Sequence, residues 1–83
     1  MNDQTSPTLG TGTGWTIAVL RRSGFGMTRE LYDCAVPAFR EAEKAVLAVS
    51  ASDDLLLVTA VEPLTSVHVK SLGLEYGEVR KRS

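Results

Sequence analysis

Residues 15–36 read WTIAVLRRSGFGMTRELYDCAV and decide how the rest of the chain is interpreted. Residues 15–22 are rich in β-branched and aromatic side chains, which favour a strand. They lead into SGFG at 23–26, where glycine supplies the positive φ that a tight turn needs. Residues 27–36 fit either a second strand or a helix, because both periods gather apolar side chains on one face.

Register favours the second strand and therefore a hairpin. If residues 23–26 form a four-residue loop, apolar side chains meet across the two strands, except that Val19 faces Glu30. The expected pairs are Arg22 with Met27, Ile17 with Tyr32, and Trp15 with Cys34. A shift by one residue would place Asp33 on the apolar face. Pro37 also disfavours helical geometry at the residue before it.

Residues 37–50, PAFREAEKAVLAVS, predict an amphipathic helix. Apolar side chains recur at steps of three and four residues, at Phe39, Ala42, Val46 and Val49. Charged side chains take the opposite side, at Arg40, Glu41, Glu43 and Lys44. Phe39 and Val46 are therefore expected in the core, whereas Leu47 falls off the apolar stripe.

Two further elements follow the helix. Residues 55–61, LLLVTAV, are apolar on both faces, as in a strand that is covered on both sides, and Pro63 is expected to end it. Residues 65–74 predict a short helix. Its expected caps are Thr65 or Ser66 at the start and a left-handed Gly73 at the end.

The expected fold is α+β, with a small antiparallel three-stranded sheet in a ββαβ arrangement and spatial order 2-1-3. The long helix packs on one face, and the short C-terminal helix follows. Residues 1–14, which end in the GTGTG tract, lack apolar anchors and are expected to form a disordered N-terminal tail. Residues 15–79 then form a single domain, and residues 80–83 are a basic C-terminal end.

Length and composition limit what this domain does. The chain has 83 residues, a formal net charge of -1 and one cysteine, Cys34. One cysteine cannot form an internal disulfide, and neither an export signal nor an apolar run of about 20 residues is visible. We therefore expect a cytoplasmic protein that does not enter the membrane.

The sequence offers little for catalysis. Cys34 with His68 is the only combination of a thiol and an imidazole, and no local signature brings the two together. One His and one Cys are also too few for a zinc site, which needs about four ligands. We expect a protein that is not an enzyme, with no catalytic residues, no metal and no cofactor, and the sequence identifies no small-molecule substrate.

Partners are expected at the sheet face that the long helix does not cover. That face carries Ala18, Leu20 and Leu31, and an uncovered apolar surface is typical of an interface. We therefore expect a protein-protein interaction module or small regulator that forms a homodimer or binds another protein. The candidate partner-binding residues are Leu20, Leu31, Leu47 and Phe25.

The alternative is a small nucleic-acid-binding domain. Basic residues cluster around the hairpin end and at the C-terminus, where they could hold phosphates beside an exposed Phe25. These residues are Arg21, Arg22 and Arg29, and Arg80, Lys81 and Arg82. The slightly acidic overall balance favours a protein partner instead.

Overall fold

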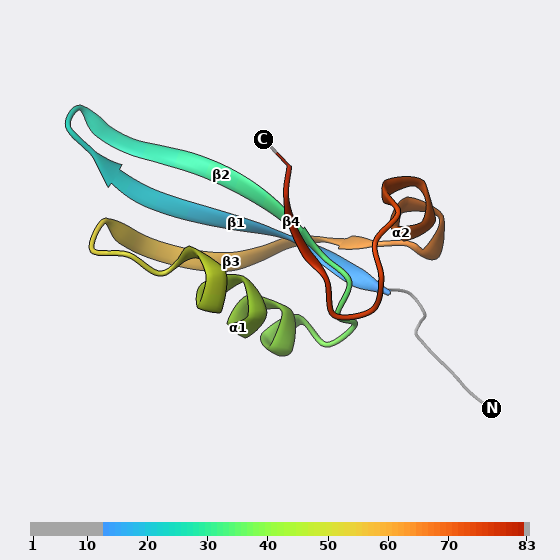
Figure 1. Cartoon of the computed structure of the whole chain (residues 1–83). Coiled ribbons are helices and arrows are strands. Elements are labelled where there is room, and N and C mark those ends of the chain that lie inside the picture. Colours follow the sequence, from blue (N-terminus) through green and yellow to red (C-terminus); the bar gives the residue numbers. More distant parts are fainter. Residues whose placement is uncertain (1–12, 83) are drawn as a thin grey trace.

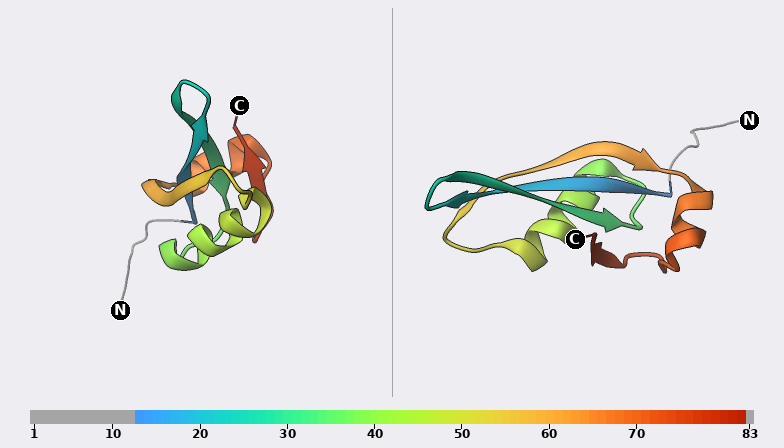
Figure 2. Two further views of the ribbon diagram at one scale, coloured as in Figure 1. Left: turned by 90° about the vertical axis from the view of Figure 1, so that its left-hand side faces the viewer. Right: turned by 90° about the horizontal axis from the view of Figure 1, so that it is seen from above.

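Four antiparallel strands form one sheet, in the order β3-β1-β2-β4, in a computed structural model that describes residues 13–82. Helix α1 lies against one face of the sheet and α2 lies at one end (Figures 1 and 2). In chain order the elements are β1 (Gly14–Ser23), β2 (Gly26–Cys34), α1 (Phe39–Ser50), β3 (Leu55–Leu64), α2 (Ser66–Leu72) and β4 (Val79–Lys81).

The β1-β2 hairpin confirms the strand interpretation of residues 27–36 through Cys34, and with it the expected register. Trp15 pairs with Cys34, Ile17 with Tyr32, and Arg22 with Met27. The turn is tighter than the expected four-residue loop, since Ser23 and Gly26 still pair with each other. Gly26 has φ 136°, a conformation that glycine adopts without strain.

The sheet has four strands, not the three that the sequence predicted. The first three strands do lie in the order 2-1-3, but β4 adds to the free edge of β2, where Val79 pairs with Cys34 and Lys81 with Tyr32. Three residues are too few to show an alternating pattern, so the basic C-terminal stretch gave no sign of a strand. The sheet thus includes two residues of the stretch at 80–83.

The N-terminal boundary also shifts by one residue. Gly14 belongs to β1 and is buried, and a Cβ there would overlap the carbonyl oxygen of Cys34. Only glycine allows this close approach of two backbones. Thr13 of the expected tail is also described, and its backbone N–H donates to the carbonyl oxygen of Leu64 at 3.1 Å. Residues 1–12 of the expected tail lie outside the described part of the chain.

The main core lies between α1 and the sheet. Its buried members are Ile17, Val19, Tyr32, Cys34, Ala42 and Val46. The prediction for Val46 is confirmed, but the prediction for Phe39 is wrong, because its side chain is 45% exposed at the start of the helix. There the Phe39 and Trp15 rings pack in a T-shaped arrangement, with centroids 5.9 Å apart.

Strand β3 differs from the expected doubly covered strand. It lies at the edge of the sheet and continues through Pro63 to Leu64, which an edge strand permits because one side of its backbone needs no partner. Leu56, Leu57 and Val61 are exposed. Residues 55–61 are therefore apolar on both faces, but only one face of this strand is covered and the apolar side chains of the other are exposed.

Helix α2 confirms both expected caps. The hydroxyl of Thr65 accepts a hydrogen bond from the backbone N–H of His68 at 3.2 Å, and Gly73 is left-handed with φ 69°. A small second core of Ala35, Leu64 and Leu74, with Val69 packed against it, holds the helix to the end of the sheet.

Candidate functional site: the open face of the sheet

Alternate side chains of each strand point away from α1. We call the surface that they form the open face, and the opposite surface, which packs on α1, the helix face. Pairing places the following residues on the open face: Thr16, Ala18, Leu20 and Arg22 from β1, Met27, Arg29, Leu31 and Asp33 from β2, Leu57, Thr59 and Glu62 from β3, and Arg80 from β4.

The middle of the open face is apolar. Leu20 pairs with Leu57 of β3, and Leu31 pairs with Ala18 of β1. Leu20 and Leu31 are partly exposed, and Leu57 is 49% exposed. Within residues 13–82, α1 lies on the other face and α2 lies at the sheet end, so neither helix covers this middle (Figure 2). Two of the expected partner-binding residues, Leu20 and Leu31, are thus near neighbours.

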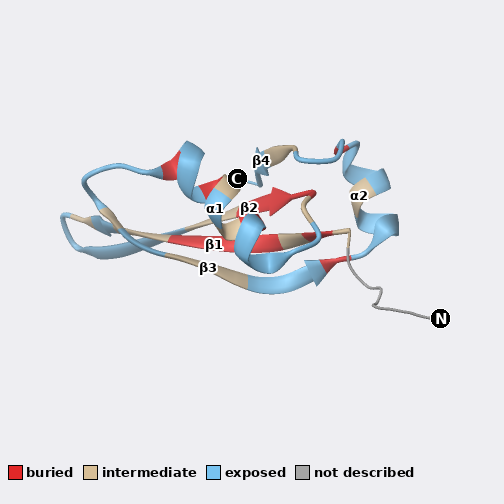
Figure 3. Cartoon of the chain, turned by 90° about the horizontal axis from the view of Figure 1, so that it is seen from below, coloured by how far each residue is buried: buried red, intermediate tan, exposed pale blue. Residues whose placement is uncertain are grey.

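The hairpin half of the open face is basic and exposed. Arg22 and Arg29 both project from it, and within residues 13–82 neither forms an ion pair. Met27 lies opposite Arg22 and is exposed. Phe25 is fully exposed in the turn. Figure 3 shows β1 buried along its middle and more exposed toward this turn.

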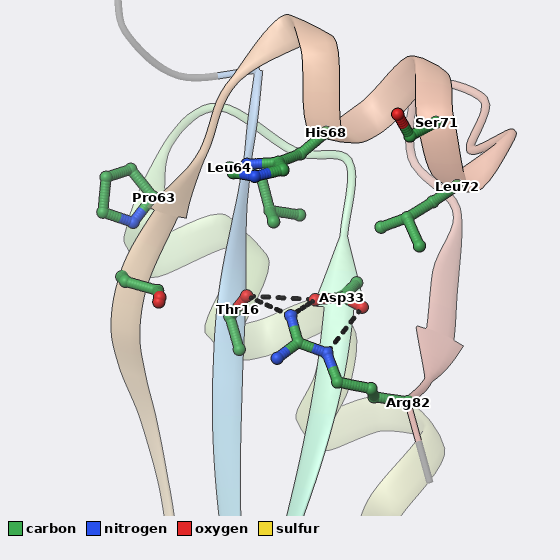
Figure 4. A pocket seen from close by; sticks show the side chains of 9 residues that line it. Thr16, Asp33, Pro63, Leu64, His68, Ser71, Leu72 and Arg82 are labelled. Carbon is green, nitrogen blue, oxygen red and sulfur yellow. Dashed lines mark hydrogen bonds and ion pairs between the residues drawn. The ribbon is translucent and has the colours of Figure 1, made fainter.

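The other half of the open face contains a polar cluster in which Arg82, whose side chain is 44% exposed, covers the buried Asp33 and Thr16 (Figure 4). Arg82 donates from Nη2 to Asp33 Oδ1 at 2.6 Å and from Nε to Oδ2 at 3.2 Å. The Thr16 hydroxyl donates to Asp33 Oδ1 at 3.0 Å and accepts from Arg82 Nη2 at 3.0 Å. The hydrogen bond with Asp33 raises the pKa of Arg82.

This cluster was missed by the sequence analysis. In the sequence argument, Asp33 served only to decide the hairpin register. In the structure its side chain is buried and only 4% exposed. A carboxylate that is surrounded by strand residues on both sides in the sequence needs a cation when it is buried. The need of Asp33 for a cation was the sequence signal that could have revealed the cluster. Arg82 of the basic C-terminal stretch supplies that cation.

A hollow of about 420 Å³ lies between this cluster and α2. Thr16, Asp33 and Arg82 form its polar floor, as Figure 4 shows. Its other lining residues are Glu62, Pro63, Leu64, His68, Ser71 and Leu72. The hollow therefore combines apolar walls with a charged floor, and it opens onto the open face.

Cys34 and His68 are not brought together. Cys34 is fully buried on the helix face, and burial raises the pKa of its thiol. His68 lines the hollow on the opposite face of the sheet. The arrangement gives neither residue the nucleophile-base contact that catalysis would require.

The six basic residues do not form one patch. Arg21 lies on the helix face and binds Glu30 at 3.0 Å and Asp54 at 3.1 Å. Partial burial raises the pKa of Glu30, but the hydrogen bond and the charge of Arg21 lower it more, so the net shift is downward. The remaining pairs are Lys81 with Glu30 at 3.5 Å, Arg80 with Glu78 at 2.7 Å, and Arg82 with Asp33.

Leu47 lies apart from the other expected partner-binding residues. It is exposed on α1, where it lines a shallow hollow with Val58 and charged residues of the helix. Because α1 packs on the helix face, Leu47 cannot belong to the same surface as Leu20. Any contact through Leu47 would be a second, separate one.

Residues 13–82 contain no helix that combines the length and the apolar character needed to cross a bilayer. Comparison of the chain with protein-family models, with curated proteins and with solved structures finds no match. A functional argument for this protein therefore rests on the open face itself.

Proposed function

We propose that this protein is a non-enzymatic protein-protein interaction module that forms a homodimer through its open face. One observation carries the proposal: Leu20, Leu31 and Leu57 form a continuous, partly exposed apolar middle on a sheet face that neither described helix covers. Apolar surface is unfavourable in water by about 25 cal/mol per Å², so a partner that covers it is stabilising.

A face contact is favoured over an edge contact, because the exposed edge of β3 resists strand pairing. Pro63 removes one donor, and two irregularities interrupt the pairing of β3 with β1. Glu43 of α1 also reaches the backbone N–H of Ala60, at 2.8 Å, and occupies that donor. Prolines, bulges and charged side chains are common devices against edge-to-edge association.

The nucleic-acid alternative has weaker support. Of the six basic residues proposed for it, only Arg22 and Arg29 are without an ion pair within residues 13–82. Two arginines neutralise few phosphates, and affinity for nucleic acid grows with the number of phosphates that are neutralised. Binding to single-stranded DNA or RNA that weakens steeply as salt is raised would support this alternative.

Sedimentation across a hundredfold concentration range tests the proposed homodimer. We expect the mass to rise from 8.9 kDa to twice that value, and Leu20→Glu to keep the protein monomeric while its circular dichroism is unchanged. Val49→Glu is the matched control, because Val49 is exposed on α1, away from the open face. A wild-type monomer at every concentration would contradict the proposal.

We also propose a cytoplasmic location. Its support is Cys34, a free thiol in the core of a chain that has no second cysteine. Fractionation of cells that express the full chain would test this, and recovery in a membrane or secreted fraction would contradict it.

A further inference from the structure

The open face carries opposite charges at its two ends. Arg22 and Arg29 lie at the hairpin end, and Glu62 lies at the α2 end, beside the hollow. Within residues 13–82, none of the three forms an ion pair. At the α2 end, Arg82 is paired with Asp33 and Arg80 with Glu78, so these charges largely cancel, and Glu62 lies near Arg82 without forming an ion pair with it. The face is therefore polarised along the strands.

Two-fold symmetry allows two simple ways for a second copy to lie on this face. If the axis runs along β1, equal positions meet, and Arg22 of one copy faces Arg22 of the other. If the axis lies across the strands, the second copy is reversed, and its hairpin end lies over the α2 end of the first. Only the reversed arrangement brings Arg22 to Glu62.

The spacing along β1 fits the reversed arrangement. Six residues, or about 20 Å, separate Thr16 from Arg22, and the midpoint falls at Val19. Reversal about this midpoint places Leu20 of one copy over Ala18 of the other, a large side chain over a small buried one. It also places Met27 of one copy over Asp33 of the other, which belongs to the floor of the hollow.

We propose that the homodimer has this reversed geometry, in which Arg22 of each copy pairs with Glu62 of the other and Met27 enters the hollow beneath α2. The arrangement rests on the homodimer proposed above. It gives the hollow an occupant: its apolar walls, Pro63 and Leu72 among them, receive an apolar side chain. The hollow is then completed by a residue of the second copy.

Charge reversal tests the geometry separately from dimerisation. We expect Arg22→Glu and Glu62→Arg each to raise the dimer Kd at least about tenfold, because each places like charges together. The double variant restores the pairing with its signs exchanged, so its Kd should return to near the wild-type value. Lys44→Glu and Glu41→Arg, on the exposed side of α1, are the matched controls and should leave the Kd unchanged.

The outcomes separate the two proposals. Single reversals without effect, or a Glu62→Arg variant that dimerises more tightly, would overturn the reversed geometry while leaving the dimer intact. A wild-type chain that stays monomeric would overturn both.

A cross-linking measurement gives a second test. In the reversed dimer the two copies of position 22 lie about 20 Å apart, too far for a disulfide. Arg22→Cys should therefore not oxidise to a covalent dimer, and efficient cross-linking at this position would contradict the geometry.

Discussion

The helix face and the open face come from the same strands, yet they differ in almost every respect. The helix face buries Ile17, Val19 and Cys34 completely under α1. The open face leaves its leucines partly exposed, and at one end the half-exposed Arg82 pairs with the buried carboxylate of Asp33. Alternation along a strand assigns side chains to faces, but the covering elements decide which face becomes a core.

The ion pair between Arg82 and Asp33 explains how the open face, which no described helix covers, still holds the C-terminal strand in place. Asp33 and Arg82 are 49 residues apart in the sequence, and their hydrogen bonds lie directly beyond the three residues of β4. A short strand gains little from its ladder alone. The charged contact therefore helps to hold β4 against β2.

The largest expected difference between the faces concerns packing. Ile17→Ala should lower the free energy of unfolding by about 2–5 kcal/mol, because it opens a cavity in the core under α1. Leu57→Ala on the open face should lower it by less than about 1 kcal/mol, since the side chain is 49% exposed. Urea denaturation measures both free energies of unfolding, at a protein concentration too low for the dimer to form. Equal losses would show that the two faces are buried alike.

The next effect concerns the ion pair of the open face. Arg82→Ala should lower the free energy of unfolding by about 1–3 kcal/mol, because Asp33 stays buried without its charged donor. Amide exchange should speed up at Ala35 and Gly77, whose backbone hydrogen bonds tie the chain before β4 to the end of β2. Adding Asp33→Asn to Arg82→Ala should recover part of the loss. No recovery would mean that Arg82 acts through packing alone.

A smaller effect marks the rim of the helix face. Phe39→Ala should cost about 1 kcal/mol, since the half-exposed ring contributes chiefly its edge contact with Trp15. Phe25→Ala in the hairpin turn is the control and should change stability by less than about 0.5 kcal/mol. If Phe39→Ala lowered the free energy of unfolding as much as Ile17→Ala, Phe39 would have to be counted as a core residue.

The smallest effect is a dependence on acid at the hairpin end of the helix face, where Glu30 pairs with Arg21. The pKa of Glu30 is lowered from its ordinary value of 4.5 in the folded chain, so its stabilisation is present above pH 4.5 and is lost as the pH falls below it. Glu30→Gln should therefore flatten the fall in melting temperature between pH 5 and pH 3. Glu41→Gln, at an exposed pair with Lys44, is the control, and an equal flattening there would contradict a special role for Glu30.

Sequence reasoning succeeded where the signal was local. Turn residues and the position of Asp33 fixed the hairpin register, and Thr65 and Gly73 marked both ends of α2. It failed for Phe39, because the helical period gives the direction of a side chain but not whether an element lies opposite it. The same limit explains β3, whose apolar residues were taken as evidence of two covered faces.

The sequence by itself determined the α+β class, the hairpin with its register, and the caps of α2, because period, turn and capping signals act over a few neighbouring residues. Only the tertiary structure decided that residues 79–81 form a fourth strand and that Arg82 neutralises Asp33. Those contacts join segments far apart in the chain, and their stability depends on geometry and burial that no short stretch of sequence encodes.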